Sequence, residues 1–206
     1  MKISNYILLI AIILTNNLVQ SQEEKESKFN IISYAGFGYS SIENDNEPSY
    51  NLNSNSGDIL LNYRINKIFG IATGIGINEL SGNGFNSIGN FYHERTLIKI
   101  PLVATMDYNV YEKFRVIANF GFYTQNIAKD EYQFLNSSQK NIYEGWNFGA
   151  QVGLGFVVEI FDSFSVGVNY TGLIDLSKFK TENNQLINDE QHTGLSTIGL
   201  MVVLDL

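Results

Sequence analysis

The sequence predicts an all-β protein, an eight-stranded antiparallel up-and-down transmembrane β-barrel. Apolar and polar residues alternate with a period of two over most of the chain, and the connections between the alternating segments are in turn short and long. One parity of each segment is almost free of charge. A period of two is typical of strands, because successive side chains of a strand point to opposite faces.

Length and composition restrict the classes of protein. The 206 residues predict one domain, and 13% aromatic residues with no cysteine exclude a disordered chain and a disulfide or thiolate-metal scaffold. The net charge is −8 and no basic run occurs. We therefore expect no nucleic acid as a partner and no polybasic attachment to a membrane surface.

Residues 1–21 are predicted to be a secretory signal peptide, and residues 22–206 the mature barrel domain. Lys2 gives the positive start, the apolar run Tyr6–Leu14 follows, and Ser21 lies at the expected cleavage position. A membrane-spanning helix is the alternative, but it needs about 20 apolar residues, and this run ends before Asn16. Without a cysteine to receive a lipid, the exported chain is not a lipoprotein.

Eight strands are expected in the mature chain. They are Phe29–Ser40, Gly57–Ile65, Phe69–Leu80, His93–Tyr108, Phe114–Asn126, Tyr143–Ile160, Phe164–Leu176 and Thr193–Leu206. Three connections are short, and four are long, polar loops: 41–56, 81–92, 127–142 and 177–192. Short turns at one end and long loops at the other are typical of a meander whose two ends face different surroundings.

The two faces of these strands indicate a membrane. A soluble sandwich or lipocalin-like barrel packs its apolar face inward and needs charged residues on the other face. Here the second parity carries mixed charges, asparagines and 11 of the 18 glycines, which fit a narrow lumen better than a surface in water. Aromatic residues near the strand ends, such as Tyr63 and Tyr108 at one end and Trp146 and Tyr170 at the other, fit the two interfacial girdles of a membrane barrel.

Charges on the lumen parity are predicted to pair and to close the barrel. This lumen network consists of Asp58, Arg64, Lys99, Asp107, Arg115, Glu159, Asp175 and Asp205. Eight strands leave an interior just wide enough for side chains, so a closed polar lumen is the expectation and a selectivity filter is the alternative.

Residues that could support catalysis or metal binding are few. His93 and His192, with Glu94 or Glu190 and Ser87 or Ser196, could form the Ser-His-acid site of an outer-membrane lipid deacylase, although solvated strand-end histidines are the favoured interpretation. The acidic segment Glu43–Glu47 lacks the turn glycine of a calcium loop. We therefore expect no catalytic residue, no cofactor and no metal.

Several short motifs resemble the eight-stranded outer-membrane β-barrel family, which includes OmpX-like, OmpA-like and PorT-like barrels. They are the run Gly70–Gly76, Ile100-Pro101-Leu102, the lumen glycines Gly149, Gly153 and Gly155, and the last strand. The resemblance covers nearly all of residues 29–206, and these motifs resemble the PorT-like type in particular. Leu206 departs from the final Phe of many such barrels. The resemblance implies location in the cell outer membrane, and no active-site motif comes with it.

Function is expected to be non-enzymatic, as a structural or surface-interaction barrel. A PorT-like docking component of a secretion or assembly machine is the first alternative, followed by a narrow pore and a lipid-modifying enzyme. The partners implied are outer-membrane lipid, the assembly machinery during insertion, and a protein at the extracellular loops or the periplasmic turns.

Overall fold

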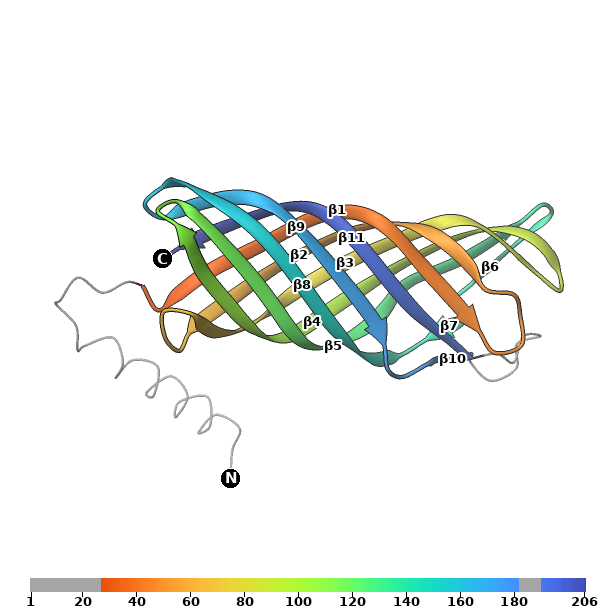
Figure 1. Cartoon of the computed structure of the whole chain (residues 1–206). Coiled ribbons are helices and arrows are strands. Elements are labelled where there is room, and N and C mark those ends of the chain that lie inside the picture. Colours follow the sequence, from red (N-terminus) through yellow and green to blue (C-terminus); the bar gives the residue numbers. More distant parts are fainter. Residues whose placement is uncertain (1–26, 182–189) are drawn as a thin grey trace, which may run out of the picture.

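The computed structural model describes residues 27–181 and 190–206, and the expected signal peptide, 1–21, lies outside this part of the chain. Eight long antiparallel strands form a closed ring in the order β1-β2-β3-β4-β5-β8-β9-β11, and β11 pairs with β1 (Figure 1). Their bounds are Phe29–Asn44, Tyr50–Arg64, Phe69–Asn86, Gly89–Tyr111, Phe114–Phe134, Trp146–Phe161, Phe164–Asp175 and Glu190–Asp205. The predicted eight-stranded up-and-down barrel is confirmed.

Three short strands lie at one end of the barrel. They are β6 (Ser137–Lys140), which pairs with β5, and β7 (Tyr143–Glu144) and β10 (Phe179–Thr181), which pair with each other. Tight turns close the opposite end, where Leu206 also lies (Figure 1). We call these the hairpin end and the short-turn end. No helix in the described residues is long and apolar enough to cross a membrane.

The apolar parity faces outward, as predicted. Ile59, Leu102, Phe120 and Leu200 are each at least 60% exposed, and together with their neighbours they form a continuous belt around the middle of the barrel. Exposed aromatic residues mark both edges of the belt, with Tyr63 and Tyr108 toward the short turns and Trp146 and Tyr170 toward the hairpins. Such an apolar band with aromatic girdles is typical of a barrel that spans a lipid bilayer.

Most of the expected long loops are in fact strand. β1 continues to Asn44 and β2 already begins at Tyr50. A turn at Ser87-Ile88 joins β3 to β4. The expected strand from Tyr143 is interrupted instead, because Gly145 has a φ of 95° and separates β7 from β8. The boundaries were wrong because the two faces exchange polarity at the edge of the belt. In β2, for example, Leu52 faces inward and Asn53 outward, whereas farther down the strand Asp58 faces inward and Ile59 outward.

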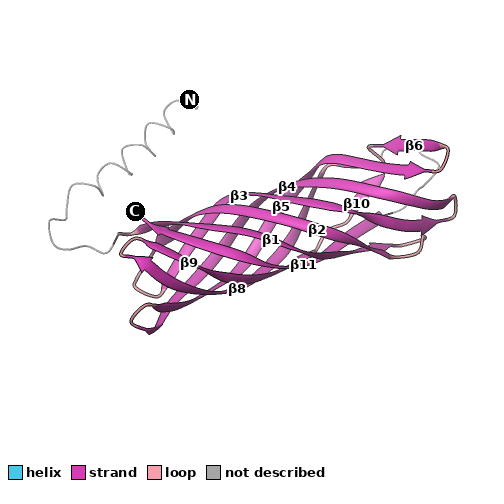
Figure 2. Cartoon of the chain, turned by 90° about the horizontal axis from the view of Figure 1, so that it is seen from above, coloured by secondary structure: helices cyan, strands magenta, loops and turns pink. Residues whose placement is uncertain are grey.

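The strands extend farthest beyond the belt on one side of the barrel. There, residues 81–86 of β3, 89–97 of β4, 127–134 of β5 and all of β6 form a four-stranded sheet. Figure 2 shows β6 at the tip of this extension, at the end opposite to Leu206. We call it the protruding sheet.

Candidate functional site

A polar layer lies at the centre of the lumen. Lys99 Nζ donates to Asp58 Oδ2 at 2.8 Å and to Gln151 Oε1 at 3.0 Å, and Gln151 Nε2 donates to Asn119 Oδ1 at 3.3 Å. Asn119 Nδ2 then donates to the Tyr34 hydroxyl at 3.2 Å. Five strands are thereby joined across the barrel by side chains that are all buried.

A second polar layer closes the short-turn end. Arg115 bonds Asp107 at 3.1 Å and lies 3.5 Å from Asp205, while Arg64 pairs with Asp205 and lies 3.6 Å from Asp107. Arg115 Nη2 also donates to Ser165 Oγ at 2.9 Å. Two arginines and two aspartates thus balance each other, which is the condition for burying charges.

The remaining two members of the lumen network differ from the prediction. Asp175 makes no ion pair among the described residues; it accepts hydrogen bonds from the Tyr123 hydroxyl at 2.6 Å, Gln125 Nε2 at 2.9 Å and the Thr193 amide at 2.9 Å. Glu159 is half-buried near the short-turn end and forms no ion pair with a described residue. The structure therefore divides the predicted network into two ionic layers and one carboxyl group, Asp175, that is held by hydrogen bonds alone, and Glu159 belongs to none of them.

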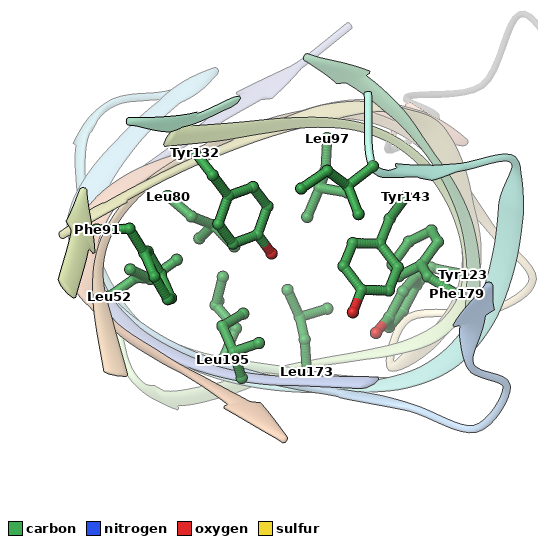
Figure 3. Packing of buried hydrophobic residues seen from close by; sticks show 12 residues of the cluster. Leu52, Leu80, Phe91, Leu97, Tyr123, Tyr132, Tyr143, Leu173, Phe179 and Leu195 are labelled. Atoms are coloured by element: carbon green, nitrogen blue, oxygen red, sulfur yellow. The ribbon is translucent and has the colours of Figure 1, made fainter. Parts of the chain in front are cut away.

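Apolar layers separate these polar ones, so the expectation of a polar lumen was wrong in part. One apolar cluster, with Ile32, Leu60, Val103, Ile117 and Met201 among its members, lies among the lumen-facing residues of the short-turn half. Another fills the hairpin half, where Leu52, Leu80, Leu97, Leu173 and Leu195 converge from different strands (Figure 3). Buried apolar side chains therefore pack together in both halves of the lumen, as far as the described residues show.

The hairpin end is closed by a set of residues that the sequence pattern did not bring together. This mouth cluster consists of Tyr50, Phe91, His93, Arg95, Asp130, Tyr132, Tyr143 and Phe179. Asp130 Oδ1 accepts from His93 Nε2 and from Arg95 Nε, both at 2.8 Å, and these three side chains are fully buried. The one signal in the sequence is an alternation of aromatic and polar residues, as in Asp130-Glu131-Tyr132-Gln133-Phe134.

The mouth cluster lies beyond the apolar belt, because outward-facing neighbours at its level are charged. Glu94 and Lys129 pair on the outer face beside His93 and Asp130. Burial lowers the pKa of His93 to about 4. Burial would raise the pKa of Asp130, but the charge of Arg95 and the hydrogen bond from His93 hold it below its ordinary value. The ring of His93 is therefore neutral at pH 7 and the carboxylate is ionised.

These ionisation states fix the direction of the hydrogen bonds. His93 Nε2 donates to the carboxylate, so Nδ1 accepts from the Tyr50 hydroxyl at 2.9 Å, and that hydroxyl accepts in turn from Tyr132 at 3.1 Å. The His93 ring stacks on Tyr132 with centroids 4.0 Å apart. Arg95 lies under the rings of Tyr143 and Phe179, at 5.3 and 5.7 Å.

Two small cavities lie among the described residues of the lumen. One of about 10 Å³ lies in the central polar layer beside Asp58, Asn78 and Asn169, and another of about 20 Å³ lies at the mouth beside Tyr50, Tyr143 and Gln191. A single water molecule needs about 10 to 15 Å³. Neither cavity has room for more than one or two water molecules.

The Ser-His-acid sites considered from the sequence are not assembled. His93 bonds Tyr50 and Asp130, and His192 pairs with Glu43 at 3.0 Å. Ser87 Oγ donates to Glu47 at 2.5 Å, and Ser196 Oγ contacts the Tyr170 hydroxyl at 3.2 Å. Within residues 27–181 and 190–206, no group of three or more histidine or carboxylate side chains is arranged to hold a metal ion.

Comparisons with known proteins place this architecture. Neisserial surface protein A (NspA) superposes with a TM-score of 0.53 at 12% identity, over 89% of this chain and 100% of that chain. The outer membrane protease OmpT from Escherichia coli gives 0.49 at 10% identity, over 90% of this chain and 100% of that chain. Ail of Yersinia pestis gives a TM-score of 0.40 at 12% identity, over 85% of this chain and 99% of that chain. No curated protein matches the sequence.

The likeness to NspA concerns the fold alone, and the family follows from a separate match. The family described as "Outer membrane protein beta-barrel domain" matches residues 7–204, which is nearly the whole chain. The closed ring, the outward apolar belt and the packed lumen agree with that match. The chain belongs to the outer membrane β-barrel family and is a protein of the cell outer membrane.

Proposed function

We propose that this barrel is a non-enzymatic, non-conducting protein whose protruding sheet contacts another protein outside the cell. The observation that carries the proposal is the exposed apolar tip of the sheet. Leu135 at the β5–β6 turn is 95% exposed, and Phe85 and Ile88 at the β3–β4 turn are 56% and 50% exposed.

The position of the tip matters more than its composition. Barrels of this class direct their longer connections outward, so the protruding sheet stands outside the cell. A strand rises about 3.4 Å per residue and tilts by about 40° in such barrels, so the segment from Ile98 to Ile88 lifts the tip about 25 Å above the hydrocarbon. Leu135, Phe85 and Ile88 are therefore too high to be covered by acyl chains, and apolar side chains exposed to water at such a place are typical of contact sites.

A closed lumen is supported by the alternation of its layers. The ionic layers at the centre and at the short-turn end pair charges of both signs, and apolar clusters separate them. The two small cavities do not offer a continuous aqueous path. We therefore disfavour the narrow pore.

A non-enzymatic role is supported by the mouth cluster. His93 and Asp130 are fully buried, and burial raises the pKa of Tyr50 to about 12, which is opposite to what a nucleophile needs. The mouth cluster therefore has neither an accessible substrate position nor an activated nucleophile.

The partners follow from the same surfaces. Outer-membrane lipid covers the belt, and the outer-membrane assembly machinery handles the chain during insertion. A docking role toward a secretion or assembly machine, of the PorT-like kind, would use the periplasmic turns at Asn66 and Asp162 instead of the protruding sheet.

A photo-crosslinking side chain at Leu135, compared with one at Asp162, separates these roles in intact cells. Adducts at Leu135 with a partner outside the cell, and none at Asp162, are the expected result. Adducts confined to Asp162 would favour the docking role. A matched probe at Ile75, in the belt, reports contact with lipid and neighbouring barrels only.

A further inference from the structure

We propose that His93 is an acid-sensitive latch that holds the inner face of the protruding sheet against the two segments that close the mouth of the barrel, residues 141–144 and β10. The proposal concerns the mouth cluster alone and holds whether or not the tip binds a partner. It rests on the position of the ring, on the direction of its hydrogen bonds and on the groups around it.

His93 lies where several elements meet. It projects from β4 of the protruding sheet, stacks on Tyr132 of β5, and bonds Tyr50 at the start of β2. Its partner Asp130 also binds the mouth segment, because the carbonyl oxygen of Asp130 accepts from the Asn141 amide at 2.8 Å and Oδ2 accepts from the Tyr143 amide at 3.3 Å. Figure 3 shows Tyr132 and Tyr143 directed into the interior of the barrel.

The hydrogen bonds are complete only when the ring is neutral. A proton on Nδ1 would face the Tyr50 hydroxyl, which would have to turn from donor to acceptor while it already accepts from Tyr132. One hydroxyl proton of the Tyr50–Tyr132 pair would then lose its acceptor in a buried place. A buried polar group without a partner is costly.

The charged groups around His93 also disfavour protonation of its ring. The charged and titratable groups facing His93 are Arg95 of β4, Asp130 and Tyr132 of β5, and Tyr50 of β2; the nearby mouth residues Tyr143 and Gln191 are neutral, and Glu47 is engaged by Ser87. Asp130 already balances Arg95. An imidazolium would therefore be a second buried cation that shares one carboxylate.

The sign of the pH dependence follows from the lowered pKa of His93, about 4 against an ordinary value of 6.5. Once the mouth opens, the ring regains its ordinary pKa, so the open state binds the proton first as the pH falls. The latch is fully effective above about pH 6.5 and weakens as the pH falls toward 4. Between these limits, the ratio of open to closed molecules rises by up to about tenfold per pH unit.

Hydrogen exchange of the Asn141 and Tyr143 amides tests the latch in the full barrel, reconstituted in lipid nanodiscs. We expect their protection factors, corrected for the intrinsic pH dependence of exchange, to be constant from pH 8 to 7. They should then fall by up to about tenfold per pH unit between about pH 6 and 4.5. The lower limit keeps Asp130 ionised, because the pKa of its carboxyl lies below the ordinary value.

Two variants provide the comparison. His93→Gln keeps one donor and one acceptor but cannot be protonated, so the protection factors should no longer depend on pH. His192→Gln removes the other histidine, which pairs with Glu43 on the rim, and should behave like the unmodified protein. Protection that is flat in the unmodified protein, or that falls equally in His93→Gln, overturns the proposal.

A second measurement decides the matter if His93→Gln fails to insert. Ring-nitrogen NMR of the two histidines in the unmodified protein gives the titration midpoint of His93 directly. A midpoint below about pH 5 that accompanies the loss of protection supports the latch. A midpoint near 6.5 with no change in the two amides overturns it.

Discussion

Gly76 shows how one residue organises the centre of the lumen. In the barrel register it lies between Asp58 of β2 and Lys99 of β4. A Cβ at this position would overlap Asp58 Oδ1 and would lie 2.9 Å from Lys99 Cε. The absence of a side chain therefore allows the lysine to reach across β3 to its carboxylate.

Gly76→Val is expected to lower the stability of the folded barrel by about 1 to 3 kcal/mol, because overpacking would separate a buried ion pair. Gly57→Val is the matched control, since Gly57 faces the belt and a Cβ there meets only the Tyr34 carbonyl oxygen, at 3.6 Å. Urea unfolding in lipid vesicles measures both variants. Equal losses would contradict the assignment of the two faces.

Lys99→Met is expected to cost about 3 to 5 kcal/mol, because it leaves Asp58 buried without its charged partner. Lys129→Met breaks an ion pair with Glu94 on the outer surface, where the lysine side chain is half exposed, and should leave the stability nearly unchanged. The same unfolding assay compares them. A smaller effect at Lys99 than at Lys129 would argue against a dry central layer.

At the scale of the element, the sequence predicted the strands well inside the belt and poorly beyond it. Alternation with apolar residues outward located the central part of every long strand. Beyond the belt the outer face meets water and the inner face packs on itself, so Leu52 and Phe91 became the inward residues of segments that looked like polar loops.

The same physics explains which site residues could be predicted. A charge on the outward parity would face lipid, so parity alone assigns the charged residues of the two ionic layers to the lumen: Asp58, Arg64, Lys99, Asp107, Arg115 and Asp205. Their pairing depends on register across several strands, which parity does not contain. Asp130, Tyr50 and Tyr132 fell in the expected loops, so their meeting with His93 could not be foreseen.

Topology can be tested at the connections between strands. A short epitope tag inserted at Asn136, in the β5–β6 turn, should be labelled by antibody on intact cells, and a tag at Asp162, in the β8–β9 turn, should be labelled only after the outer membrane is permeabilised. Labelling of Asp162 on intact cells would reverse the orientation and place the protruding sheet in the periplasm.

At the scale of the whole molecule, the barrel is an apolar belt around a packed core. Leu200→Arg and Val152→Arg should each destabilise the inserted barrel by about 2 to 4 kcal/mol, because both side chains face the middle of the belt. Asn53→Arg also faces outward but lies beyond the belt, and should be tolerated. Heat-modified mobility on gels reports insertion, and equal tolerance of all three would refute the position of the belt.

The packed core also predicts that the protein does not conduct. The purified barrel should give no stable single-channel steps in a planar bilayer. Arg115→Ala should lower stability or raise leak, because it removes one of the two cations that balance Asp107 and Asp205. Reproducible ion-selective steps from the unmodified protein would overturn the closed lumen and favour the pore.

In the described part of the chain, the protruding sheet rises on one side of the ring, over β3, β4 and β5, while β8 and β9 end close to the belt (Figure 1). Seen from outside the cell, the protein therefore has a front and a back. Rotation about the membrane normal changes which neighbour the tip of the sheet overhangs. Binding to an adjacent membrane protein would thus favour one rotational orientation of the barrel about the membrane normal. Binding to a soluble partner outside the cell would not depend on that orientation.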